Sequence, residues 1–216
     1  MLPIGDDNSG RRTAPLVTYG LIVLNVLFFL VEMSGGDAFV MQWSFIPSRF
    51  LANPGANLVT IFTSMFMHAG LLHLAGNMLY LWIFGDNVED RFGHTPFLVF
   101  YLLCGIAATF AQLLFSANSS IPNLGASGAI AGVLAAYLVM FPQARISVMQ
   151  GNAVVPVSAL VMIGLWFVLQ LFSGIGSISN AGSGGVAYMA HIGGFVAGLL
   201  LTPVFRGSSR PRLTSY

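Results

Sequence analysis

The feature that most constrains this chain is a series of long apolar segments separated by short polar ones. A bilayer core about 30 Å thick needs about 20 apolar helical residues per span, and fewer where neighbouring helices shelter the span. Six segments meet this requirement, at residues 14–33, 71–84, 96–115, 127–141, 154–172 and 186–205. Only 7% of the residues are charged, against roughly 25% in an average soluble domain. The sequence therefore predicts an all-α, polytopic bundle of six transmembrane helices.

The arginines predict the orientation of this bundle. One membrane domain, residues 14–205, lies between short tails at 1–13 and 206–216, and six spans place both tails on one side. Arginine favours the cytoplasmic side, and every arginine except Arg49 falls in a tail or an even-numbered loop. We therefore expect cytoplasmic termini. The first outer loop is long and aromatic, which is typical of a segment in the membrane interface, and the Gly/Ser-rich last outer loop, residues 173–185, is expected to be mobile.

Composition also limits the classes of partner. The formal net charge is +1 and the chain has no lysine, so no broad basic surface is available to neutralise nucleic-acid phosphates. Membrane lipid is the expected surrounding and nucleic acid is not an expected partner. The single cysteine, Cys104, lies in an apolar segment and is expected to be a small buried hydrophobe.

Polar side chains in three of the segments are predicted to lie at one depth. Polar residues within spans are costly, and function is their default explanation. His73 and Asn77 are four residues apart and share a helix face. Ser127 begins the fourth segment and His191 comes early in the sixth. The second, fourth and sixth segments all enter from the outer side, so these side chains are predicted to converge there.

Small residues predict that the fourth and sixth helices touch. Glycines at every fourth position allow close approach of two helices in a membrane. They are Gly128 and Gly132 in the fourth segment and Gly194 and Gly198 in the sixth. Their contact would bring Ser127 and His191 within hydrogen-bond reach. A histidine next to a serine takes the hydroxyl proton and makes the serine a nucleophile, whereas His73, Asn77 and the Ser127 main-chain N–H could stabilise an oxyanion.

Three motifs, in order along the chain, resemble those of the rhomboid family of intramembrane serine proteases. They are His68-x4-His73-x3-Asn77, Gly125-x-Ser127-Gly128 and Ala190-His191-x2-Gly194-x3-Gly198. The resemblance implies a compact bundle with a water-filled cavity that opens outward, and a Ser127–His191 dyad without an acidic third member. It implies cleavage of single-span membrane proteins, which enter past the second and fifth helices, and no metal or cofactor. His68 and Gly125 would support the site. The bare six-helix core is most similar to prokaryotic members, which implies a plasma-membrane location.

Two departures from the family pattern and two alternatives stay open at this point. The aromatic residue that many members carry four positions after the serine is Ala131, and their Trp-Arg pair is Val59-Thr60. The first change leaves the orientation of the His191 ring unexplained, and the second leaves the anchoring of the first outer loop unexplained. The alternatives are a catalytically inactive, rhomboid-like membrane chaperone or binding protein, and a small-solute channel with polar residues along its pathway.

Overall fold

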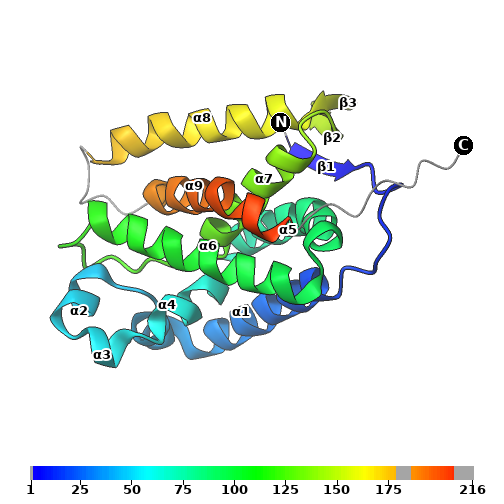
Figure 1. Cartoon of the computed structure of the whole chain (residues 1–216). Coiled ribbons are helices and arrows are strands. Elements are labelled where there is room, and N and C mark those ends of the chain that lie inside the picture. Colours follow the sequence, from blue (N-terminus) through cyan, green and yellow to red (C-terminus); the bar gives the residue numbers. More distant parts are fainter. Residues whose placement is uncertain (1, 179–185, 207–216) are drawn as a thin grey trace, which may run out of the picture.

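Six long helices form the body of the protein in the computed structural model, which describes residues 2–178 and 186–206 (Figure 1). Each predicted segment overlaps one of them, and the mainly helical fold is confirmed. The helices are α1 (Leu16–Trp43), α5 (Leu71–Phe92), α6 (His94–Phe115), α7 (Ser127–Met140), α8 (Ala159–Ile178) and α9 (Tyr188–Phe205).

By length and composition, fewer helices qualify as membrane spans than the six long helices of the bundle. Four helices in the described part are long and apolar enough to cross a membrane, and a fifth candidate counts residues 54–66 and α5 as one span bent by 77°. Helix α7 has 14 residues and is therefore about 21 Å long, shorter than the hydrocarbon core. Six spans thus remain a prediction, in which α7 is the short, sheltered member.

A small antiparallel sheet, which the all-α prediction missed, lies at one end of the bundle (Figure 1). Strand β2 is central and connects to β3 through a turn at Gly151, where φ is 62°. The start of the predicted fifth span is therefore wrong, because the valines around Pro156 favour an edge strand and proline cannot donate within a helix. The predicted N-terminal tail likewise contains a strand. The strands are β1 (Leu2–Asp6), β2 (Arg145–Gln150) and β3 (Ala153–Ser158).

Asp6, the last residue of β1, fastens the sheet to the bundle. Its Oδ2 accepts hydrogen bonds from the Tyr137 hydroxyl on α7 and from Nδ2 of Asn87 on α5, each at 2.7 Å. Burial raises the pKa of Asp6 to about 6, and the nearby charge of Asp86 acts in the same direction, against the opposing effect of the Tyr137 hydrogen bond. The carboxyl group is therefore a titratable link between the sheet and two helices.

Glu89 joins α5 to the beginning of α1. Its side chain is fully buried and accepts hydrogen bonds from the main-chain N–H groups of Val17 and Thr18 and from the Thr18 hydroxyl, at 2.7–2.9 Å. Nδ1 of His94 lies 2.6 Å from the same carboxylate. A carboxylate at a helix N-terminus satisfies free N–H groups and complements the helix dipole, so Glu89 fixes α1 against α5.

Short helices connect α1 to α5 at the end opposite the sheet (Figure 1). Helix α1 continues beyond a break at Gly36, where φ is 57°, so part of the predicted outer loop is helical. The guanidinium of Arg49 donates to the main-chain carbonyls of Met41, Gln42 and Ser44. These bonds anchor the loop, in which Val59-Thr60 stands where the Trp-Arg pair was expected from the resemblance. The connecting elements are α2 (Pro47–Ala52), α3 (Pro54–Asn57), α4 (Thr60–Thr63) and η1 (Ser64–Phe66).

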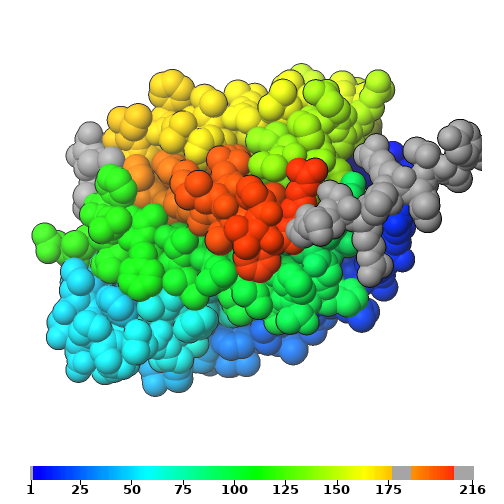
Figure 2. Space-filling view, viewed as in Figure 1, coloured from blue at the N-terminus to red at the C-terminus, as the bar shows by residue number. Residues whose placement is uncertain are grey.

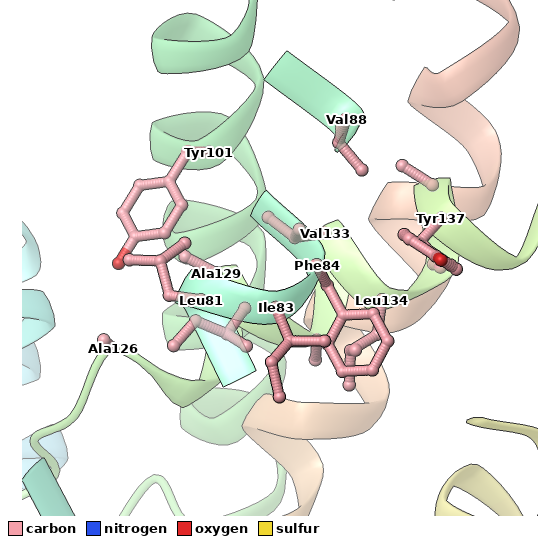
Figure 3. Packing of buried hydrophobic residues seen from close by; sticks show 14 of the residues in the cluster. Leu81, Ile83, Phe84, Val88, Tyr101, Ala126, Ala129, Val133, Leu134 and Tyr137 are labelled. Carbon is pink, nitrogen blue, oxygen red and sulfur yellow. The ribbon is translucent and has the colours of Figure 1, made fainter. Parts of the chain in front are cut away.

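Helices α5, α6 and α7 enclose the core, which Figure 3 shows from close by. Leu81, Phe84, Tyr101 and Val133 are fully buried there, and the rings of Phe84 and Tyr137 meet edge to face at 5.0 Å. Helices α1, α6, α8 and α9 also expose large apolar side chains on their outer faces. The space-filling view shows that these helices reach the surface (Figure 2). A surface of this kind is solvated by lipid.

Candidate active site

Helices α7 and α9 touch backbone to backbone, which brings Ser127 and His191 together. A Cβ atom added to Gly194 would overlap the carbonyl oxygen of Gly128, and one added to Gly198 would overlap the backbone of Gly132. On the other side, a Cβ on Gly128 would meet Ala108, and one on Gly132 would meet Cys104. The predicted contact of the two glycine stripes is thus present, and Cys104 is buried as expected.

Oγ of Ser127 lies 2.8 Å from Nε2 of His191. Ser127 is the first residue of α7, so its main-chain N–H has no acceptor within the helix. His191 is only 8% exposed. The two side chains therefore form a hydrogen-bonded pair at the ends of two tightly packed helices.

The other nitrogen of His191 has a partner that the sequence prediction missed. Nδ1 lies 2.8 Å from Oε1 of Gln170 on α8. The ring centroid is 5.9 Å from that of Trp166 and 6.4 Å from that of Tyr188. Ala131, at the position where the resemblance led us to expect an aromatic residue, is fully buried, so α8 provides the aromatic neighbour instead. The signal in the sequence was a glutamine near the end of the predicted fifth span, one helical turn after a tryptophan.

His73 and Asn77 lie along the same cavity as the Ser127–His191 pair. Nδ1 of His73 accepts a hydrogen bond from the Ala69 N–H at 3.3 Å, which leaves the hydrogen of the neutral ring on Nε2. That ring packs against Gly125, where φ is 132° and a Cβ would come within 3.0 Å of Nε2. Nδ2 of Asn77 is buried and has no hydrogen-bond partner among the described residues. Nε2–H of His73 and Nδ2–H of Asn77 are thus donors with no acceptor among the residues that the structure describes.

The cavity has a volume of about 1210 Å³ and also contains two carboxylates, Glu32 and Asp37. Glu32 is 5% exposed and accepts a hydrogen bond from the His68 N–H at 2.9 Å. The imidazole of His68 is buried and meets that of His73 edge to face at 5.1 Å. Glu32 was also missed, although it is the one acidic residue in the predicted first span. Glu32 is hydrogen-bonded to His68 and not to His191. Among the described residues, the hydrogen-bond partners of the His191 ring are Ser127 and Gln170, so no carboxylate contacts it.

The residues that the structure describes around this cavity form no metal site, and they include only part of the last outer loop. Among residues 2–178 and 186–206, no group of three or more His, Cys, Asp and Glu side chains could hold a metal ion. The predicted mobile outer loop is shorter than expected because α8 extends to Ile178. Residues 179–185, the rest of that loop, lie outside the described residues.

Comparison with known proteins gives consistent matches to one family. Residues 55–208 match the family model described as "Rhomboid domain". The chain is 31% identical to "Rhomboid protease GluP" of Bacillus subtilis over 85% of its own length and 34% of that protein. It is 29% identical to "Presenilin-associated rhomboid-like protein A, mitochondrial" of Danio rerio, over 91% of the chain and 49% of that protein. It is 29% identical to "Rhomboid protein 1, mitochondrial" of Saccharomyces cerevisiae, over 85% of the chain and 51% of that protein. The chain thus spans about a third to a half of the relatives that it matches.

Proposed function

Because the chain belongs to the rhomboid family, we propose that this integral membrane protein is a serine endopeptidase. It would hydrolyse peptide bonds in or near transmembrane segments of other membrane proteins. The observation that carries the proposal is the 2.8 Å contact between Oγ of Ser127 and Nε2 of His191 inside a large cavity. The name of the B. subtilis relative, a rhomboid protease, gives independent support.

The proposed reaction uses this contact twice. Nε2 of His191 takes the hydroxyl proton while Oγ of Ser127 bonds to the carbonyl carbon of the substrate peptide. The same proton then passes to the departing amine as the C–N bond breaks, which leaves an acyl-enzyme. Water, deprotonated by His191, releases the second product and restores the serine.

The oxyanion of the tetrahedral intermediate requires donors aimed at it. Three groups are proposed for this role: Nε2–H of His73, Nδ2–H of Asn77 and the main-chain N–H of Ser127. Their availability supports the assignment, since Nδ1 of His73 is already an acceptor and Asn77 Nδ2 has no partner in the described part. Each such donor is worth about 10²–10³ in rate in serine proteases.

The two alternatives predict different properties of the cavity. An inactive rhomboid-like chaperone has no need of a hydrogen-bonded serine and histidine, so the 2.8 Å contact favours an enzyme. A channel needs polar residues through the inner half of the bundle, yet Ser127 is the one residue of α7 that lines the cavity and His191 the one residue of α9. The cavity is therefore better suited to a reaction than to a pathway.

The natural substrates, the membrane and the orientation belong to the same proposal. Single-span membrane proteins are the proposed substrates, and the arginine distribution favours cytoplasmic termini with the site opening to the outer side. One relative comes from the bacterium B. subtilis, whereas several other relatives are named as mitochondrial. The names therefore weaken the prediction of a prokaryotic plasma membrane.

A fluorophosphonate probe tests the assignment directly. The probe should label the purified protein at Ser127, and His191→Ala should abolish labelling because the serine loses its base. Ser127→Ala should keep the protein folded and membrane-inserted while cleavage of a tagged single-span protein in proteoliposomes stops. Cleavage by Ser127→Ala would require another nucleophile and would refute the proposal. A chemically unreactive wild-type protein would instead favour the inactive alternative.

A further inference from the structure

The two ring nitrogens of His191 have partners on two different helices. Nε2 faces Ser127 on α7, and Nδ1 faces Oε1 of Gln170 on α8, each at 2.8 Å. The reaction proposed above uses Nε2 alone. That reaction does not account for the half-buried glutamine held against the other side of the ring.

We propose that Gln170 is a positioning residue of the active site: its side-chain oxygen accepts a hydrogen bond from Nδ1–H of His191 and keeps Nε2 unprotonated and directed at Ser127. The inference rests on the proposed function, since it requires His191 to be the base. It would supply, as a neutral amide, the orienting group that a carboxylate supplies in a soluble triad.

The direction of this hydrogen bond follows from the other end of the amide. Nε2 of Gln170 donates to the main-chain carbonyl of Trp166, one helical turn earlier, at 3.4 Å. This leaves Oε1 for His191, and an amide oxygen can only accept a hydrogen bond. Nδ1 of the neutral imidazole must therefore carry the hydrogen, and Nε2 presents a lone pair to the serine hydroxyl.

The opposite tautomer would be unproductive. With its hydrogen on Nε2, the ring would donate to Oγ of Ser127 and could not take the hydroxyl proton. In a soluble serine protease, a substitution that imposes the wrong tautomer lowers kcat about 10⁴-fold. Gln170 can favour the productive tautomer without adding a buried charge, which would be costly at this position in a membrane.

Helix α8 also restricts rotation of the ring. Trp166 precedes Gln170 by one turn, and its ring lies tilted beside that of His191 at 5.9 Å. Tyr188 approaches the imidazole edge-on from α9. Because residue 131 is alanine, no aromatic side chain is available from that position of α7. One face of α8 thus provides both the aromatic neighbour and the hydrogen-bond acceptor.

Three substitutions test the role. Gln170→Met keeps the length of the side chain but removes the acceptor, Gln170→Glu keeps an acceptor oxygen, and Leu169→Met is the matched control, because Leu169 is adjacent and 53% exposed. The measurements are kcat and KM for a tagged single-span protein in proteoliposomes, and the maximal rate of fluorophosphonate labelling. Gln170→Met should lower kcat and the labelling rate roughly 10-fold, the effect of one hydrogen bond, with KM and melting temperature near wild type. Gln170→Glu should recover most of the rate, and Leu169→Met should behave as wild type.

Several outcomes would overturn the assignment. One is a wild-type kcat in Gln170→Met, and another is a change confined to KM. A third is an equal loss of rate in Gln170→Met and Gln170→Glu, which would show that the side chain matters through its packing and not through its acceptor oxygen. If Gln170→Met does not fold, Gln170→Glu is compared with Gln170→Asn, whose shorter amide does not reach Nδ1, and equal rates would count against the role. A fully active Gln170→Met beside an inactive Ser127→Ala removes only the role of Gln170. Cleavage by Ser127→Ala would remove the proposed function itself.

Discussion

Replacing Gly194 by alanine tests whether the contact of α7 and α9 sets the distance between Ser127 and His191. The added Cβ would overlap the carbonyl oxygen of Gly128 and lie 3.4 Å from Cβ of Ala108. The first obstacle is backbone, so no rotation of a side chain relieves it. Carbon and oxygen need about 3.5 Å, and α9 must therefore move away from α7 by on the order of 1 Å.

A shift of that size has two measurable effects. It would lengthen the 2.8 Å bond between Oγ and Nε2 beyond the range of a hydrogen bond, and a misplacement of about 1 Å can lower the rate about 10²-fold. Overpacking costs about 1–3 kcal/mol, which corresponds to a fall in melting temperature of roughly 2–12 °C for a chain of this size.

The assays are the rate of fluorophosphonate labelling at Ser127 and thermal unfolding in detergent. Gly20→Ala in α1 is the matched control, because a Cβ there would meet nothing within 4 Å. The double variant with Ala108→Gly should not recover the rate, since the overlap with Gly128 remains. Wild-type labelling and melting temperature in Gly194→Ala would refute the reasoning.

Three further predictions concern the oxyanion, the α1 junction and the sheet. Asn77→Ala should lower kcat roughly 10²–10³-fold with little change in melting temperature, because it removes a proposed oxyanion donor. Glu89→Ala should lower the free energy of unfolding by about 3 kcal/mol, because it leaves buried donors of Thr18 unpaired. Asp6→Asn should remove a pH dependence of melting temperature. The folded-state pKa of Asp6 is about 6, above its ordinary value of 3.8, so the stability that Asp6 contributes should be full below pH 3.8, decline between about pH 4 and 6, and then level off.

Matched controls separate these effects from general damage. Gly76→Ala tests the neighbour of Asn77, since a Cβ there meets nothing within 4 Å, and it should leave kcat unchanged. Glu89→Gln keeps one acceptor oxygen and should lose less stability than Glu89→Ala. Asp7→Asn, at an exposed position beside Asp6, should retain the decline between pH 4 and 6. Equal behaviour within any of these pairs would contradict the corresponding prediction.

Much of the fold and the central contact could be predicted because both depend on local sequence patterns. A helix in lipid satisfies its own backbone, so apolar runs of sufficient length indicate helices directly. Spacing of four places Gly194 and Gly198 on one helix face, and the cost of polar groups in a membrane made His191 conspicuous. The predicted proximity of His191 to Ser127 then followed from depth and close packing.

The missed features depend on partners far away in the chain. Strand β1 pairs with residues 145–150, and its own residues carry no sign of that partner. Gln170 lies near the end of the predicted fifth span, where an amide resembles a residue at the membrane boundary. Its contact with His191 depends on the extension of α8 beyond that boundary and on the position of His191. Glu32 was missed for a similar reason, because its partner is a main-chain N–H in a connecting loop.

The backbone contact between α7 and α9 has a consequence for how such a protein can change over time. Peptide units have fixed dimensions and no rotamers, so a spacing set by Gly128 against Gly194 does not vary when side chains elsewhere repack. Residues that face lipid, such as Leu200, can then be exchanged as the surrounding bilayer differs between organisms or organelles. Adaptation to a new lipid composition would leave the distance between Oγ of Ser127 and Nε2 of His191 unchanged.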